Sequence, residues 1–138
     1  MEKIIKQLAV LGVAGAMTLN LGCDLEVEDA DFAPSSLAER IIFFTGTATE
    51  SDGTTNAEEG TATFSASTLV LTNSDGSPET LNYIYTKTSH NSGSLTWTSP
   101  SEPGALIIQM SFTSPTSGSY TGADTEGSTE VGTFAQTN

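Results

Sequence analysis

Residues 105–114 read Ala-Leu-Ile-Ile-Gln-Met-Ser-Phe-Thr-Ser. Large apolar side chains occupy every second position, at Leu106, Ile108, Met110 and Phe112, and most residues between them are polar. Side chains two residues apart point to the same face of a β-strand, so this pattern predicts a strand with one face in a core and the other toward water. An amphipathic helix would instead need apolar residues three or four apart.

The same alternation extends in both directions from this stretch. It recurs at Leu69 and Leu71 and again at Leu95 and Trp97, with turn sequences such as Ser-Asp-Gly between the runs. Short runs at regular intervals of about 8–12 residues are typical of all-β meanders. The expected strands are residues 40–49, 58–65, 68–72, 80–88, 94–98, 105–113, 117–122 and 128–135.

About eight antiparallel strands in simple order predict an all-β meander. Short, even loops favour an up-and-down, lipocalin-like barrel, complete or partly open, because closure removes unpaired edges. A two-sheet β-sandwich is the alternative. The runs Ile41–Phe44 and Val131–Phe134 are apolar on both faces, which suggests either strands covered on both sides or strands at a seam.

Two stretches of the sequence together support the meander. They are Tyr83-Ile84-Tyr85-Thr86-Lys87-Thr88 and the later Phe112-Thr113-Ser114-Pro115-Thr116-Ser117-Gly118. They resemble the Tyr-x-Tyr-x-Lys-Thr and Phe-Thr-Ser-x-x-Ser-Gly hairpin unit of secreted and lipid-anchored bacterial proteins. The resemblance implies β-hairpins and no particular chemistry.

Residues 1–23 have a different character. Lys3 and Lys6 precede an apolar run at Leu8–Leu19, which fits a signal peptide and is shorter than the roughly 20 residues of a membrane span. The stretch Leu19-Asn20-Leu21-Gly22-Cys23 follows, and it resembles the lipobox of bacterial lipoproteins. The resemblance implies that Cys23 is acylated, with chains such as palmitate, and becomes the mature N-terminus.

One position departs from the lipobox pattern, and the sequence also contains a second possible site of signal-peptide cleavage. Asn20 stands where lipoproteins usually have leucine. The alternative is ordinary signal cleavage after Ala14-Gly15-Ala16, which would release a soluble chain that starts at Met17.

These features divide the chain into three parts. Residues 1–22 are the expected signal peptide, residues 23–36 a lipidated cysteine with an acidic tether, and residues 37–138 the β-meander domain. Residues 24–36 contain five carboxylates and no basic residue, a composition typical of a solvated spacer. Beyond residue 22 only Arg40 and Lys87 oppose sixteen acidic residues, which excludes nucleic acid as a partner. The single cysteine allows no intrachain disulfide.

Few residues suggest chemistry. His90, the single histidine, is expected to be a solvated turn residue, and we expect no catalytic residue, metal or cofactor. Three acidic turns could supply oxygen ligands for calcium, namely Asp52 with Glu58 and Glu59, Asp75 with Glu79, and Asp124 with Glu126. Asp-Gly pairs are also what hairpin turns require. Five aromatic side chains could line a ligand cavity or pack the core, namely Tyr83, Tyr85, Trp97, Phe112 and Tyr120.

The sequence therefore favours a non-enzymatic lipoprotein of the cell envelope, attached to a membrane through lipid at Cys23. Its acidic β domain would have a structural or interaction role, with another envelope protein as a possible partner. The alternative is a lipocalin-like carrier that binds a small apolar ligand inside the barrel. A hydrolase is the remote third hypothesis.

Overall fold

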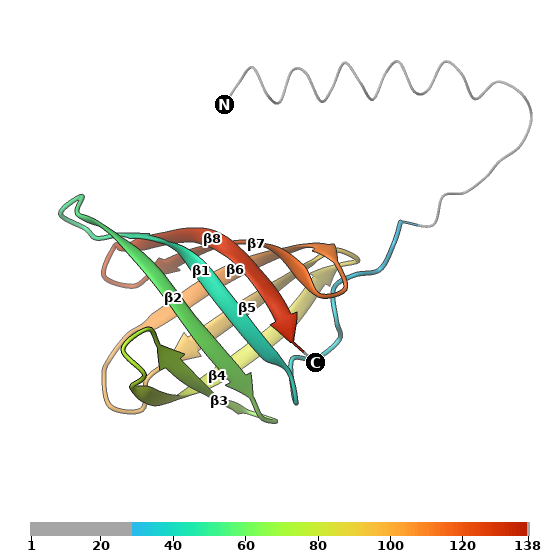
Figure 1. Cartoon of the computed structure of the whole chain (residues 1–138), viewed down its shortest axis with the longest axis horizontal. Helices are drawn as coiled ribbons and strands as arrows, with labels where there is room; N and C mark the ends of the chain where they lie inside the picture. The colour runs from blue at the N-terminus through green and yellow to red at the C-terminus, as the bar shows by residue number, and fades with distance from the viewer. Residues whose placement is uncertain (1–28, 138) are drawn as a thin grey trace, which may run out of the picture.

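The computed structural model describes residues 29–137, which form a closed antiparallel β-barrel of eight strands (Figure 1). Each strand pairs with the next along the chain, and β1 pairs with β8 to close the barrel. The predicted all-β meander and the up-and-down barrel are confirmed, and the sandwich alternative is wrong. The strands are β1 (Ile41–Thr49), β2 (Thr55–Phe64), β3 (Thr68–Asn73), β4 (Pro78–Ser89), β5 (Ser92–Thr98), β6 (Ala105–Ser114), β7 (Ser117–Asp124) and β8 (Thr129–Thr137).

Three strands begin earlier than the apolar pattern predicts. β2 begins at Thr55 instead of residue 58, β4 at Pro78 instead of residue 80, and β5 at Ser92 instead of residue 94. None of the added residues has a large apolar side chain like those that mark the predicted strands, so hydropathy alone does not mark them. Proline is tolerated at the first residue of a strand, because the missing N–H is not needed there.

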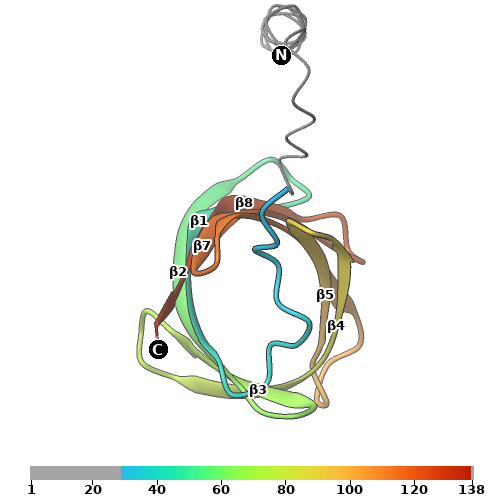
Figure 2. The ribbon, with the colours of Figure 1, turned by 90° about the vertical axis from the view of Figure 1, so that its right-hand side faces the viewer.

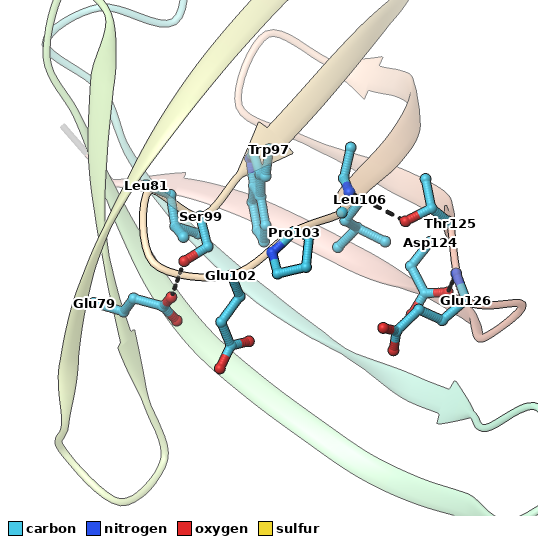
Figure 3. A pocket seen from close by; sticks show the side chains of 12 residues that line it. Glu79, Leu81, Trp97, Ser99, Glu102, Pro103, Leu106, Asp124, Thr125 and Glu126 are labelled. Carbon is cyan, nitrogen blue, oxygen red and sulfur yellow. Dashed lines mark hydrogen bonds between the residues drawn. The ribbon is translucent and has the colours of Figure 1, made fainter.

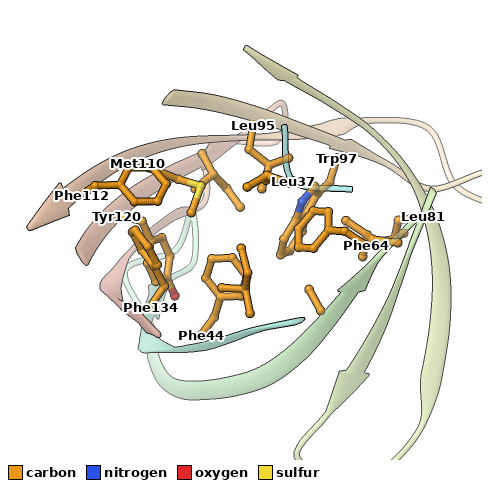
Figure 4. Packing of buried hydrophobic residues seen from close by; sticks show 14 of the residues in the cluster. Leu37, Phe44, Phe64, Leu81, Leu95, Trp97, Met110, Phe112, Tyr120 and Phe134 are labelled. Carbon is orange, nitrogen blue, oxygen red and sulfur yellow. The ribbon is translucent and has the colours of Figure 1, made fainter. Parts of the chain in front are cut away.

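The barrel interior is filled with side chains rather than open. The ring of Phe44 lies 5.6 Å from the ring of Trp97 and 5.3 Å from that of Tyr120, each in an edge-to-face arrangement. Each large apolar side chain contributes about 1.5–3 kcal/mol when it is fully buried. Figure 4 shows the packing. The large buried residues are Leu37, Ile42, Phe44, Phe64, Leu69, Leu81, Leu95, Trp97, Ile108, Met110, Phe112, Tyr120 and Phe134.

The strands with two apolar faces lie at the seam of the barrel. β1 and β8 form the closing ladder, in which Phe44 is opposite Phe134, and both rings point inward. The outward residues Ile41 and Phe43 remain 40% and 39% exposed, and Val131 is 56% exposed. The seam explanation therefore agrees with the structure, while cover on both sides does not.

Residues 31–40, which we call the strap, cross one end of the barrel (Figure 2). Ala33 is 4% exposed and Leu37 is fully buried. The N–H of Ala33 donates to the carbonyl oxygen of His90 at 2.8 Å, and Lys87 of β4 forms a salt bridge with Asp31. The ordered domain therefore begins before residue 37, and the second half of the expected spacer is packed on the barrel.

Candidate functional site

The two ends of the barrel differ in charge. In an up-and-down barrel, the β1–β2, β3–β4, β5–β6 and β7–β8 turns share one end, and the strap and the other turns share the opposite end. We call the first the acidic mouth and the second the plugged end. All three basic residues of the described chain, Arg40, Lys87 and His90, lie at the plugged end. The acidic mouth has ten carboxylates: Glu50, Asp52, Glu58, Glu59, Asp75, Glu79, Glu102, Asp124, Glu126 and Glu130.

Clefts lie between these carboxylates and the part of the apolar core that is nearest the acidic mouth. One, of about 240 Å³, has Trp97 and Leu106 among its lining residues, with Glu79, Glu102 and Glu126 around it (Figure 3). A second, of about 180 Å³, lies over Phe44 and Trp97 and is bordered by Glu58 and Glu130. Both are smaller than the roughly 300–1,000 Å³ that is typical of sites for small organic ligands.

The aspartates of the turns hold the turns in shape. Asp52 accepts a hydrogen bond from the N–H of Thr54 at 2.8 Å, and Asp124 accepts one from the N–H of Ser128 at 2.9 Å. These backbone hydrogen bonds are the main reason that the pKa of each aspartate is lowered, because they favour the ionised carboxylate. The pKa of Asp75 is also lowered, first by a hydrogen bond from the hydroxyl of Ser77 and then by one from the N–H of Ser77. Residues 29–137 contain no group of three or more acidic, histidine or cysteine side chains placed to hold a metal ion.

Three glutamates converge on the inner wall of the acidic mouth. Burial raises the pKa of Glu58, and the nearby charges of Glu130 and Glu50 raise it further. The hydroxyl of Tyr120 donates a hydrogen bond to the Glu130 carboxylate. The pKa of Tyr120 is raised well above its usual range, first by burial and then by this hydrogen bond and the charges of Glu130 and Glu58. The inner wall therefore brings the negative charges of Glu50, Glu58 and Glu130 close together, and the hydrogen bond from Tyr120 offsets their repulsion only in part.

Glu58→Gln is expected to stabilise the barrel slightly at neutral pH. Because the pKa of Glu58 is raised in the folded state, its contribution to stability is complete below its unfolded pKa, near 4.5, and is lost as the pH rises through the raised value. Since the carboxylate is largely solvated, we expect a gain below about 1 kcal/mol at pH 7. Urea unfolding of both proteins at pH 4 and pH 7 measures this gain in the free energy of unfolding.

Glu59→Gln is the matched control, because Glu59 is the next residue and points to the outer face of β2, opposite Thr45. It removes the same charge without relieving the inner wall. A gain for Glu58→Gln that is equal at both pH values, or equal to that of Glu59→Gln, would contradict the role of the inner wall.

The five aromatic residues predicted as ligand contacts are mostly part of the packed interior. Trp97, Phe112 and Tyr120 are 9%, 3% and 3% exposed. Tyr83 and Tyr85 are partly buried, and their hydroxyls donate to the carbonyl oxygens of Ser65 (2.6 Å) and Pro34 (3.1 Å). Burial raises the pKa of Tyr85 to about 12. The structure thus brings these aromatics into one cluster, in which only Trp97 also lines the two clefts described above.

The sequence singled out Glu58 only as a possible calcium ligand beside Asp52, and it did not single out Glu130, although a signal for the inward position of both exists. Inward positions on β2 include Gly60, Ala62 and Phe64, and Glu58 continues that series toward the acidic mouth. Glu130 continues the inward series of β8 in the same way. Extending the alternation of each strand past its apolar part would have found both residues.

No family model, curated protein or solved structure matches this chain. Cys23, the predicted lipid-attachment site, lies outside the described residues. From residue 29 to residue 137, the structure has no helix that is long and apolar enough to cross a membrane. His90 is an exposed turn residue at the plugged end.

Proposed function

We propose that this chain is a lipid-anchored protein of the bacterial cell envelope that displays a small acidic β-barrel in a structural or interaction role. The observation that supports this most is the stretch Leu19–Cys23, in which glycine and then cysteine follow an apolar run with basic residues before it. Two or three acyl chains on one cysteine give stable attachment, since each buried methylene contributes about 0.8 kcal/mol.

The form of the barrel supports an interaction role over a carrier role. A carrier of a small apolar molecule needs a chamber inside the barrel, but aromatic and aliphatic side chains fill the space between the strands. The mouth clefts of about 180 and 240 Å³ are bordered by carboxylates, which do not favour an apolar ligand. The acidic mouth of this filled barrel is instead a rigid surface with a dense negative charge.

A non-enzymatic role agrees with where the titratable side chains lie. His90 is at the plugged end, whereas ten carboxylates are at the acidic mouth. General acid–base chemistry with histidine needs its partner within hydrogen-bond reach. The carboxylates with lowered pKa are those that hold the turns, so they are assigned a structural role.

The test is Cys23→Ser in the full chain, expressed in a bacterium. Because the serine variant has no thiol to acylate, we expect it to move from the membrane fraction to the soluble fraction. The intact mass of the wild-type protein, extracted with detergent, should equal that of the chain from Cys23 onward plus acyl groups. Asn20→Leu is the matched control; it strengthens the lipobox pattern and should remain in the membrane fraction. A serine variant that stays in the membrane, or a soluble wild-type product starting at Met17, would refute the proposal.

A further inference from the structure

The strap determines which end of the barrel the anchor reaches. Asp31 pairs with Lys87, the N–H of Ala33 donates to the His90 carbonyl oxygen, and Leu37 is fully buried at the plugged end. Only seven residues, 24–30, lie between Cys23 and this fixed point. Even when fully extended, the chain from Cys23 to Asp31 spans no more than about 28 Å. A lipid on Cys23 therefore holds the plugged end close to the bilayer.

Reach alone would also allow the barrel to lie on its side, so its charge distribution matters. The β-strands of a barrel rise about 3.3 Å per residue at a tilt of about 40°, which places the two ends of a nine-residue strand such as β1 roughly 20 Å or more apart. That separation exceeds the screening length of about 8–10 Å at physiological ionic strength. Each end therefore responds separately to the charge of a membrane surface.

The two ends are repelled by such a surface to different extents. The acidic mouth has ten carboxylates, and in the described part of the chain the only salt bridge, Lys87 with Asp31, is at the plugged end. The plugged end has three carboxylates, Asp29, Asp31 and Glu39, against Arg40 and Lys87, and the connection to Cys23 adds three more, Asp24, Glu26 and Glu28. An anionic lipid surface therefore repels the acidic mouth, with ten carboxylates and no basic residue, more strongly than it repels the plugged end and its connection.

We propose that the anchored protein stands upright on the bilayer, with the plugged end toward an anionic lipid surface and the acidic mouth turned away from it. This orientation rests on the proposed lipid anchor at Cys23. The short connection selects the end that is near the membrane, and repulsion of the acidic mouth keeps the barrel from tilting over. The acidic mouth is then the surface offered to other molecules.

Two labelling positions at opposite ends of β3 test the orientation. Ala66 is an exposed residue of the β2–β3 turn at the plugged end, and Ser74 is an exposed residue of the β3–β4 turn at the acidic mouth. The lipidated variants Ala66→Cys and Ser74→Cys are labelled with one fluorophore, because acylation blocks the thiol of Cys23. The proteins are placed in vesicles of phosphatidylcholine and phosphatidylglycerol that contain a headgroup-attached quencher.

The fluorophore at residue 66 should be quenched at least about twofold more than the one at residue 74, because the two ends lie roughly 20 Å apart. Vesicles of phosphatidylcholine alone should reduce this ratio, since the repulsion of the acidic mouth is then removed. Proteins that float with the vesicles but show equal or reversed quenching would overturn the orientation and leave the anchor intact. Proteins that have no acyl chains and do not float would overturn the anchor and the orientation together.

Discussion

Replacing Phe44 with alanine is expected to lower the free energy of unfolding by about 3–5 kcal/mol, the range for deletion of a large buried aromatic side chain. The ring is 5% exposed and lies edge-to-face with Trp97 and Tyr120, and its centroid is 6.3 Å from that of Phe134. Its removal leaves a cavity bordered by aromatic side chains from three other strands, β5, β7 and β8. Urea unfolding, followed by the fluorescence of Trp97, the single tryptophan, measures the loss.

The neighbouring phenylalanine is the matched control for this experiment. Phe43 has the same side chain on the same strand but is 39% exposed on the outer face. Phe43→Ala is expected to cost about 1 kcal/mol or less, because its ring already contacts water in the folded protein. If the two variants lose equal stability, β1 is not oriented with Phe44 inward.

The alternation of side chains was enough to predict the strands and their inward faces. Ile108, Met110 and Phe112 are all buried, as the spacing in residues 105–114 requires. The choice between a barrel and a sandwich was harder, because it depends on pairing between strands far apart in the chain. The β1–β8 ladder decides it, and the only local sign of that ladder was a pair of strands that are apolar on both faces.

The strap could not be predicted, because its composition indicates a solvated spacer. The apolar residues of the strap that pack against the core, Phe32, Ala33 and Leu37, are too few to suggest burial by themselves. They are buried because the closed barrel presents an apolar end and a free carbonyl oxygen, that of His90, which accepts the N–H of Ala33. The inward position of Glu58 was missed for a related reason: hydropathy does not show which charged residues continue an inward face.

Gly132→Ala is expected to destabilise the barrel by about 3 kcal/mol or more, beyond the usual cost of overpacking, because the obstruction is backbone. A Cβ atom at residue 132 would lie 2.1 Å from the carbonyl oxygen of Thr45 and 2.7 Å from the Cα of Gly46. Both atoms belong to β1, which pairs with β8 at the seam, so neither can move without opening the closing ladder. The same Cβ would lie 2.8 Å from the ring of Tyr120.

Gly122→Ala provides the matched control, because it adds the same methyl group at another inward position. There the nearest atom is the Cδ1 of Leu106 at 3.3 Å, at the end of a flexible side chain, followed by the Cβ of Glu130 at 3.5 Å. We expect a change within about 1 kcal/mol by the same urea measurement. Displacement of Tyr120 in Gly132→Ala should also weaken its hydrogen bond to Glu130, whereas Gly122→Ala should preserve it. Equal losses in the two variants would mean that β1 and β8 do not approach as closely at Gly46 and Gly132 as the closed barrel requires.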